Sequence, residues 1–367
     1  MSAQSAGLSA PPTNCDGSDQ VTVLLCTYNG ASHLREQLLS IFEQTLSPAE
    51  IVVSDDGSSD GSLEIIREAV SEFNAELELP VKIVQTGNSG SGIVANVQYA
   101  MRHVTMPLVA FADQDDVWFP NRLRLTVDLL NETGGAMVGA NAILVREDLS
   151  TLDLSARDRL MLSRRDRRQL AADRPLPVLL RGNIVPGMTI TASSAFVRSC
   201  LPVPDGWIHD YWFCLIAAVG GQLTLNETPV VLYRQHADNQ LGIELPSVPV
   251  GTPRWLEVLR EKRTRYEDLR TTPGGRRKEP AVWGDSEVVG RLCAETDRAA
   301  TQNLLRSKAR FAHRRASLPH SGAVARIALV LANLFAGNYS RFVRTGASAA
   351  LGDLIPARRT RAQGEGS

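Results

Sequence analysis

The chain has 367 residues, of which 43% are hydrophobic and 22% are charged, and its formal net charge is −1. This length can bury the core of one large α/β domain and a smaller appendage. A charge so close to zero gives no general attraction to nucleic acid, so we expect no nucleic-acid partner. The five cysteines form no CxxC pair, which excludes a zinc framework and a disulfide scaffold and indicates a reducing, cytoplasmic location.

After residue 20 the chain alternates strand-like and helix-like patterns. The apolar runs that predict buried strands are Val21–Cys26, Ile51–Ser54, Val81–Gln85 and Leu108–Ala112. Apolar residues at helical spacing lie between these runs, over 31–44, 63–73 and 93–100. The alternation predicts an α/β, Rossmann-like fold with a mostly parallel sheet and helices on both of its faces.

Polar residues gather where three of these predicted strands end. They occupy positions 27–29 after the first strand, 55–56 after the second and 113–116 after the fourth. In parallel sheets of this kind, ligands bind beyond the carboxyl ends of the strands. The sequence therefore predicts a ligand-binding cleft at this edge of the sheet.

The rest of the chain extends this domain and then changes character. We expect further strands over 136–145, 190–197 and 230–233 and a helix over 208–219. The catalytic domain is therefore predicted to span 21–245, with halves at 21–130 and 131–245. Residues 1–20, rich in Ser, Ala and Pro, are predicted to be a disordered leader. Residues 246–367 are predicted to be a helical C-terminal region, broken at 272–275, with a disordered tail.

Segment 298–352 contains nine Lys or Arg residues and no acidic residue. Within it, the run 327–336 is apolar but far shorter than the roughly 20 residues that a membrane span needs. A basic helix with an apolar face can lie on an anionic membrane, at the inner face of the plasma membrane for a cytoplasmic protein. Packing of this helix on the catalytic domain is an equal alternative.

The cluster 113–116 carries three carboxylates in the sequence Asp113-Gln114-Asp115-Asp116. Carboxylates this close repel one another unless a cation or hydrogen-bond donors compensate. Oxygen ligands of this kind suit Mg²⁺ or Mn²⁺, which also bind substrate phosphates. The alternative is an acidic turn that caps the following helix, a role that suits Asp116.

Three weaker motifs accompany this cluster. Asp55 and Asp56 open a turn and could accept hydrogen bonds from a base or a ribose, although Asp-Gly-Ser is common turn material. Asp210, flanked by aromatic residues, could be a general base or simply an N-cap. Arg234 could clamp a phosphate and His236 could bind metal or phosphate, although a lone His is more often structural.

Taken in order, these motifs resemble the family 2 glycosyltransferases, which are inverting enzymes with a GT-A fold. The matching text is VTVLLCTYNG at 21–30, QTLSPAEIVVSDDGSSDGS at 44–62, FADQDDVWFP at 111–120, HDYW at 209–212 and YRQHADNQLG at 233–242. The DQDDVW and YRQH segments resemble the rhamnosyltransferase-like branch, which builds bacterial surface polysaccharides. The resemblance covers residues 21–242.

The resemblance implies a role for each matching residue. It implies that Asp210 is the catalytic base and that Asp115, Asp113 and His236 hold a divalent metal, Mg²⁺ or Mn²⁺. The residues implied to bind the nucleotide-sugar are Thr27, Tyr28, Asn29, Asp55, Asp56, Asn96, Asp113, Gln114 and Arg234. The residues implied to bind the acceptor are Trp118, Gly187, Met188, His209 and Trp212.

The resemblance also implies partners, with some points left open. The donor it suggests first is dTDP-rhamnose, with UDP-hexoses and GDP-sugars as alternatives, and the acceptor is a glycan or a lipid-linked glycan. The family's Ala-Arg-Asn before the third helix is here VAN at 94–96, which lacks the Arg. The processive Gln-x-x-Arg-Trp motif is also missing, which favours transfer of single sugars. A nucleotidyltransferase and a non-catalytic glycan-binding protein remain alternatives, and oligomerisation is open.

Overall fold

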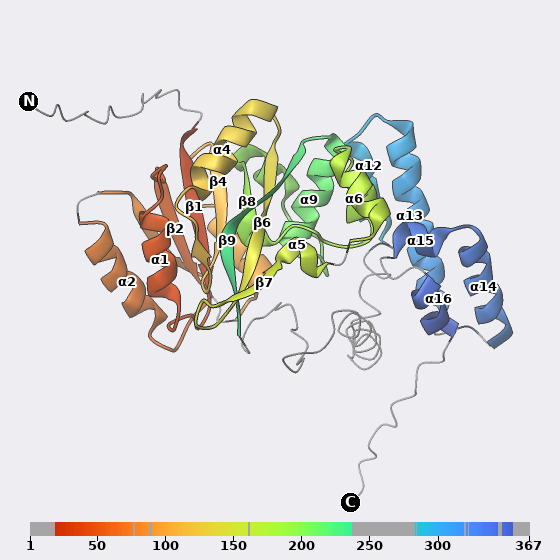
Figure 1. The fold of residues 1–367 in the computed structure, drawn as a ribbon, viewed down its shortest axis with the longest axis horizontal. Coiled ribbons are helices and arrows are strands. Elements are labelled where there is room, and N and C mark those ends of the chain that lie inside the picture. Colours follow the sequence, from red (N-terminus) through yellow and green to blue (C-terminus); the bar gives the residue numbers. More distant parts are fainter. Residues whose placement is uncertain are drawn as a thin grey trace, which may run out of the picture.

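The computed structural model describes residues 19–75, 78–87, 90–160, 162–236, 283, 285–318, 321, 323–343 and 347–354. Within these residues, a nine-stranded sheet forms the body of the molecule and a group of helices forms its C-terminal end (Figure 1). The strands run in the order β3-β2-β1-β4-β8-β6-β9-β5, and β7 pairs with β6 beside this path.

The N-terminal half of the sheet is parallel, as the sequence predicts. Its strands are β3 (Val81–Gln85), β2 (Glu50–Asp55), β1 (Val21–Thr27) and β4 (Leu108–Asp113). All residues of β1 and β2 are buried, which explains their continuous apolar runs. Thr27 pairs with Asp55 and Cys26 pairs with Asp113, so the polar ends of the three strands meet at one edge.

The second half of the sheet is mixed rather than parallel. The strands that complete it are β5 (Val117–Trp118), β6 (Met137–Arg146), β7 (Thr151–Ser155), β8 (Ile190–Ser193) and β9 (Leu223–Gln235). β8 runs antiparallel to both β4 and β6, whereas β9 runs parallel to β6. The predicted strand 190–197 is wrong beyond Ser193, because the Ser193 hydroxyl accepts from the Phe196 N–H and starts a helix.

Helices cover both faces of the sheet, as the sequence predicts. The helices on one face include α1 (Leu34–Phe42), α2 (Ser62–Phe73) and α4 (Arg122–Thr133). Those on the other face include α3 (Ile93–Ala100), α8 (Ser194–Cys200) and α9 (His209–Gly220). Side chains of β1 alternate between the two cores, with Val23 and Leu25 on the α1 side and Leu24 and Cys26 on the α3 side.

Segment 146–182 adds three short helices between β7 and β8. They are α5 (Ala156–Arg159), α6 (Arg164–Ala171) and α7 (Leu176–Leu179), and a 3₁₀ turn at Gly187–Thr189 follows them. Both α5 and α6 begin with a capping box, in which a Ser side chain and an Asp three residues later bond each other's backbone N–H groups.

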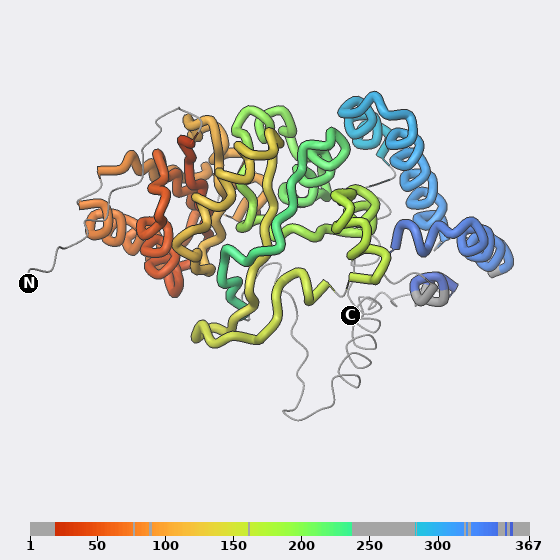
Figure 2. The backbone as a smooth tube through the Cα atoms, turned by 45° about the horizontal axis from the view of Figure 1, so that its top comes forward, coloured from red at the N-terminus to blue at the C-terminus, as the bar shows by residue number. Residues whose placement is uncertain are grey.

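The C-terminal helices form an arm at the end of the molecule away from α1 and α2 (Figures 1 and 2). They are α12 (Ser286–Ala294), α13 (Ala299–Ser317), α14 (Ala323–Phe335), α15 (Asn338–Phe342) and α16 (Ala347–Leu354). Arg291 of α12 attaches this arm to the sheet domain by donating to the backbone oxygens of Cys200 and Pro202. Among the residues described, every helix is too short or too polar to cross a bilayer. The predicted break at 272–275 and the predicted tail lie outside the described residues.

Candidate functional site

A cavity of about 560 Å³ lies at the edge of the sheet where β1, β2 and β4 end. Its lining includes residues that the sequence singles out at all three strand ends: Thr27, Tyr28, Asn29, Asp56, Asp113, Gln114 and Asp115. Asn96 of α3 and His236, which follows β9, also line it. The parallel strands bring these positions together because their carboxyl ends share one edge. The predicted cleft is therefore present in the structure.

Three carboxylates crowd together at the end of β4. Burial, and then the charges of Asp115 and Asp210, raises the pKa of Asp113 to about 7. Burial likewise raises the pKa of Asp116 well above its usual range, and the nearby Asp115 and Asp113 add to this effect. Asp116 is fully buried, whereas the Asp115 side chain keeps 14% of its surface exposed and lines the cavity. The cavity thus has an excess of negative charge at this point.

A buried positive charge accompanies this cluster. It is the guanidinium of Arg122, the first residue of α4. Arg122 is fully buried, and its guanidinium donates to the backbone oxygens of Phe111 (2.8 Å) and Met188 (2.7 Å). The Trp118 ring lies 3.5 Å from the guanidinium carbon. Burial lowers the pKa of Arg122 to about 9, and the charges of Asp116 and Asp113 oppose that shift. Arg122 is therefore the internal counter-charge of the carboxylates.

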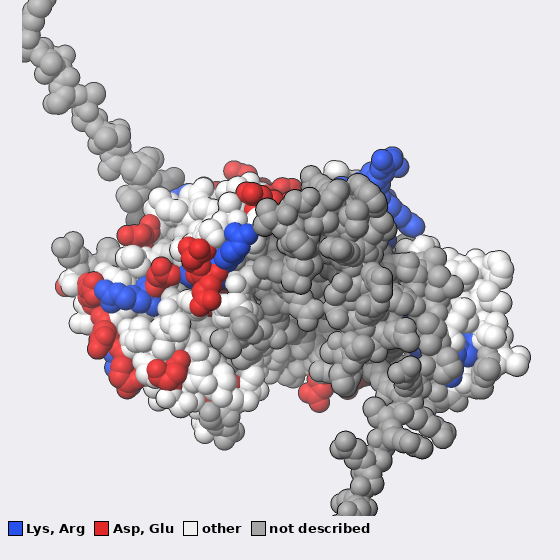
Figure 3. Space-filling view, turned by 60° about the horizontal axis from the view of Figure 1, so that its bottom comes forward, with Lys and Arg blue, Asp and Glu red and all other residues white. Residues whose placement is uncertain are grey.

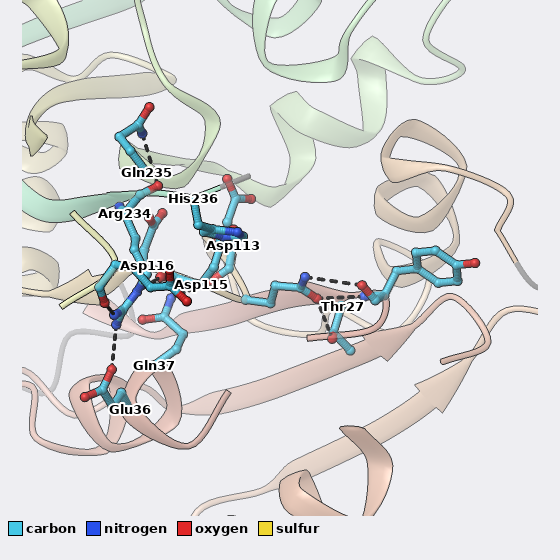
Figure 4. Close-up of polar contacts among 12 residues, drawn as sticks. Thr27, Glu36, Gln37, Asp113, Asp115, Asp116, Arg234, Gln235 and His236 are labelled. Atoms are coloured by element: carbon cyan, nitrogen blue, oxygen red, sulfur yellow. Dashed lines mark hydrogen bonds and ion pairs between the residues drawn. The ribbon is translucent and has the colours of Figure 1, made fainter. Parts of the chain in front are cut away.

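Asp115 and His236 form a pair at the mouth of the cavity. His236 follows the last residue of β9, and its Nε2 lies 2.9 Å from Asp115 Oδ2. The His33 ring stacks at a tilt beside His236, with the ring centroids 5.0 Å apart. Figure 4 shows the His236 and Asp113 side chains beside Asp115. The structure therefore brings together the three residues that the sequence associates with a metal.

Gln114 joins the end of β4 to the end of β1. Its Oε1 accepts from the Thr27 hydroxyl and from the Tyr28 N–H, both at 2.8 Å, and its Nε2 donates to the Tyr28 carbonyl (Figure 4). Gly30 lies directly against this amide, because a Cβ at residue 30 would stand 2.4 Å from Gln114 Oε1. Gln114 thus holds the two loops in a fixed relation across one wall of the cavity.

The two acidic residues at the end of β2 have different surroundings. Asp56 lines the cavity and accepts from the Gly92 N–H (2.8 Å) and the Thr86 hydroxyl. Asp55 is fully buried and accepts from the N–H groups of Gly57 and Ser58, so it shapes the turn below the cavity. The prediction that Asp55 contacts the nucleotide is corrected by this burial.

The Asn96 side chain lies beside the ends of β1 and β2, at the wall of the cavity. Its side chain accepts from the Ser54 hydroxyl (2.6 Å) and donates to the Ser54 carbonyl (3.0 Å), and it is almost completely buried. Asn96 therefore positions the ends of β1 and β2, although it also contributes to the cavity lining.

Asp210 lies at the start of α9, on the acceptor side predicted from the sequence. Asn183 donates to its Oδ2 at 2.9 Å, and the Tyr211 N–H donates to its Oδ1. Burial raises the pKa of Asp210 to about 7, and these hydrogen bonds only partly oppose the shift. Because the charge of Asp210 also raises the pKa of Asp113, the two carboxylates belong to one electrostatic site.

Gly187 and His209 adjoin this carboxylate. A Cβ at Gly187 would lie 3.5 Å from both Asp210 Cβ and His209 Nε2. Burial lowers the pKa of His209 to about 4, so its imidazole is neutral at physiological pH. Gly187 and His209 are therefore direct neighbours of the Asp210 carboxylate.

Arg234 lies behind the site rather than in it. Its guanidinium donates to the Asp115 carbonyl (2.7 Å), to the Glu147 carbonyl and to Glu36 (Figure 4). Its N–H donates to Asp116, and only 3% of its side chain is exposed. This geometry corrects the prediction of a phosphate clamp, because the guanidinium is committed to holding the carboxylate loop in place.

Three residues predicted to contact the acceptor are buried in the core instead. Trp212 has no exposed surface, and its indole N–H donates to the Cys200 carbonyl. Trp118 packs on Arg122, and Met188 is 1% exposed. Aromatic residues beside a motif suggest a sugar platform by sequence alone, but here their large apolar surfaces stabilise the fold. These three expectations are therefore corrected.

Sequence reasoning missed several residues that hold the site together. Gln37 of α1 donates to the Asp113 carbonyl at 2.8 Å, and Glu36 pairs with Arg234. Asn183 orients Asp210 from a loop, and Arg122 sits between elements distant in sequence. We see no sequence signal for Arg122, because a helix-start arginine is usually exposed.

The donor set suits a hard divalent cation. Asp113 and Asp115 provide carboxylate oxygens, and His236 provides a ring nitrogen on the same side of the cavity. Among the described residues, no group of three or more His, Cys, Asp or Glu side chains is placed so that it could hold a metal ion by itself. Mg²⁺ and Mn²⁺ do not require one, because substrate phosphates and water complete their coordination.

The fold and the site define a GT-A-like α/β protein with an acidic cavity at the ends of its parallel strands. Residues 22–183 match the family model described as "Glycosyl transferase family 2".

Two relatives illustrate how similar this sequence is to known proteins, in identity and in the length matched. The chain is 34% identical over 110 residues to an uncharacterized glycosyltransferase of Nostoc sp., covering 30% of this chain and 32% of that protein. It is 24% identical over 230 residues to the dTDP-rhamnosyl transferase RfbG of Shigella flexneri, covering 60% of this chain and 74% of that protein. The match therefore spans only about a third of the first relative and about three quarters of the second.

A solved structure supports the fold. Residues 1–349 of S. aureus TarS, crystallised in complex with UDP-GlcNAc, align with a TM-score of 0.50 at 16% identity. The alignment covers 85% of this chain and 81% of the TarS chain. The expected GT-A class is thereby confirmed.

Replacing Arg122 should expose its role as counter-charge. Arg122→Met keeps most of the side-chain volume but removes the buried positive charge that faces Asp113 and Asp116, and leaves Arg234 as the other cation beside Asp116. We expect a loss of about 3–5 kcal/mol in the free energy of unfolding at pH 7.5, measured by urea denaturation. Arg124→Met is the matched control, since Arg124 is 45% exposed in its ion pairs and should cost less than about 1 kcal/mol. Equal losses in the two variants would contradict this role.

The raised pKa of Asp210 predicts a pH-dependent gain in stability for Asp210→Asn. The folded protein holds the Asp210 proton up to about pH 7, because burial raises the pKa of this carboxyl, whereas the unfolded chain releases it near the ordinary Asp pKa of 3.8. Wild-type stability therefore falls as pH rises through this window, and the neutral amide avoids that loss. We expect the melting temperature of the variant, measured in EDTA, to exceed that of wild type at pH 8 by several degrees and to approach it at pH 5. A constant difference at all pH values would contradict the assignment.

Proposed function

We propose that this protein is an inverting, metal-dependent glycosyltransferase that moves a sugar from a nucleoside diphosphate sugar to an acceptor hydroxyl. The supporting observation is the pairing of two kinds of carboxylate at one site. Asp113 and Asp115 end β4 beside His236, and Asp210 approaches from α9 with a pKa near 7. Asp113 and Asp115 suit the binding of the donor's diphosphate, and Asp210 suits removal of the proton from the acceptor hydroxyl.

The donor occupies the cavity at the ends of the parallel strands. In this proposal Thr27, Tyr28, Asn29 and Asp56 surround the nucleoside, since they line the wall formed by the ends of β1 and β2. The diphosphate then lies toward Asp115 and His236. A divalent cation held by Asp115, Asp113 and His236 would supply charge neutralisation for the departing nucleoside diphosphate. Gln114 keeps the nucleoside wall and the metal-binding loop in register.

Asp210 acts as the general base. A carboxylate with a pKa of about 7 is partly ionised at neutral pH and is a much stronger base than an exposed Asp. It takes the proton of the acceptor hydroxyl while that oxygen bonds to the anomeric carbon. The bond from the anomeric carbon to the diphosphate oxygen breaks in the same displacement, so the configuration inverts. Asn183 fixes the orientation of the carboxylate, and Gly187 and His209 border the acceptor position.

The choice of donor and acceptor rests on similarity alone. The name of the Shigella flexneri relative specifies a dTDP-rhamnosyl transferase, so dTDP-rhamnose is the first donor to test. UDP-hexoses and GDP-sugars are the alternatives. The acceptor we propose is a glycan or lipid-linked glycan of a bacterial surface polysaccharide, extended by one sugar at a time.

The central test replaces the proposed base. Asp210→Asn should lower the turnover number by roughly 10²–10⁴-fold, while its affinity for the nucleoside diphosphate stays near that of wild type. Transfer is measured with a panel of dTDP-, UDP- and GDP-sugars, and nucleotide affinity by calorimetry. Undiminished transfer would remove Asp210 as the base, and release of pyrophosphate from a nucleoside triphosphate and a sugar phosphate would favour a nucleotidyltransferase.

Asn183 offers a test of how the base is tuned. Its hydrogen bond stabilises the ionised form of Asp210, so Asn183→Ala should raise the pKa of Asp210 further. The acidic limb of the kcat/KM profile should then move to higher pH, with activity recovering partly in alkaline buffer. A profile that only drops in height, with an unchanged midpoint, would show that Asn183 does not tune Asp210.

The metal assignment is tested without turnover. Thermal shifts with dTDP, UDP and GDP, each with and without Mn²⁺, report base preference and metal dependence together. We expect Mn²⁺ to increase the nucleotide-induced shift in wild type and to have no such effect in Asp115→Asn. Asp128→Asn, in an exposed pair on α4, is the matched control. An equal effect of Mn²⁺ in wild type and Asp115→Asn would exclude Asp115 as a ligand.

A further inference from the structure

Helix α14 presents an apolar face to the outside of the molecule. Val324 and Phe335, near its two ends, are 83% and 86% exposed, and Ile327, Leu331 and Leu334 between them are 39–49% exposed. The remaining exposed positions of the helix are Ala325, Ala328 and Ala332. The outward face of α14 therefore contains no polar or charged side chain.

The polar residues of α14 point toward the protein instead. Arg326 donates to the backbone oxygens of Leu318 (3.1 Å) and Ser321 (3.0 Å) at the end of α13. Asn333 is 2% exposed and donates to the Leu329 carbonyl. A surface helix of a globular protein normally has the opposite arrangement, with charges in water and apolar residues against the core. α14 is thus apolar on its outward face as well as on its inward one, where Val330 is buried, and this indicates that the outward face meets an apolar environment.

Basic groups accompany this face on the same arm. Segment 298–352, which includes α13 to α15, has nine Lys or Arg residues and no acidic residue. Of these, Lys308 is buried and Arg315 pairs with Asp353 just beyond the segment, so the other basic residues are the ones available to a partner surface. Figure 3 shows the end of the molecule that carries α14 as an uncharged surface with scattered Lys or Arg and no Asp or Glu in view. The opposite end, which carries α1 and α2, shows many acidic side chains in the same view.

A second basic feature lies next to α15, the helix that follows α14. A cavity of about 200 Å³ lies between the α6–α7 segment and α15, and four arginines line it: Arg165, Arg174, Arg181 and Arg341. Arg181 pairs with the buried Asp166. The other three guanidinium groups make this cavity suitable for a phosphate group.

We propose that α14 is an interfacial anchor that seats this protein on an anionic lipid bilayer. The apolar face would enter the boundary between headgroups and acyl chains, where a helix of this kind gains apolar burial without crossing the membrane. The surrounding basic residues would contact anionic headgroups. A second copy of the chain fits this surface less well, because pairing two such faces would bring two basic arms together.

The test is flotation of the full chain with vesicles of phosphatidylcholine alone or mixed with phosphatidylglycerol. Wild type should float with the anionic vesicles, and Leu331→Glu with Phe335→Glu should weaken that binding roughly tenfold or more, because each carboxylate must enter the interface. Leu154→Glu is the matched control, since Leu154 is 37% exposed on β7, and it should bind as wild type does. Unchanged thermal melts would show that the variants are folded.

A second pair of substitutions separates charge from apolar burial. Arg174→Gln with Arg341→Gln should reduce the preference for anionic over neutral vesicles and flatten the salt dependence of binding. Wild type that fails to float with anionic vesicles at low salt would overturn the proposal. So would a wild-type dimer that Leu331→Glu converts to a monomer, since the apolar face would then belong to a second copy. Vesicle binding requires no transfer of sugar, so this test stands apart from that of the proposed function.

Discussion

The site depends on how its buried carboxylates are compensated, by the buried cation Arg122 from below and by Arg234 beside Asp116. Arg122 lies at the start of α4, below the loop that carries Asp113 and Asp116, and its guanidinium reaches the backbone of β4 and the 3₁₀ turn before β8. Carboxylates cannot be buried together without such compensation. Because Arg122 offsets only part of the charge, the pKa of Asp113 stays high and the cavity remains attractive to a further cation. The same residue thus stabilises the sheet and leaves the mouth of the cavity acidic.

Sequence patterns predicted the N-terminal part of the fold, in which the local hydrophobic pattern is enough to identify each strand and helix. The strands β1 and β2 are buried throughout and β4 is buried over its central residues, so their apolar runs and their polar ends are visible without the structure. Beyond residue 131 the strands pair antiparallel in some places and parallel in others. The order of strands and helices along the chain then no longer predicts which strands are neighbours in the sheet. The short β8 illustrates this, because a single serine cap decides where the strand becomes a helix.

Site residues divide in the same way. Those at strand ends, such as Asp115 and Gln114, were predictable because the sheet itself brings them together. Arg234 and Trp212 were misread, because a motif gives the residue type but not the direction of its side chain. Arg234 points away from the cavity to hold the loop, and Trp212 fills the core. Arg122 could not be predicted, since its partners come from β4 and the 3₁₀ turn, which lie far apart in the sequence.

The contact between Gly30 and Gln114 has a consequence for how proteins of this type can diverge. No Cβ fits at residue 30 while the Gln114 amide bridges Thr27 and Tyr28. A larger residue at 30 becomes acceptable only after position 114 shortens, and that change in turn releases the β1 loop. Substitutions at the two positions therefore depend on each other. Either change alone gives a protein in which the bridge between the two loops is weakened. Substitutions there should be inherited as pairs.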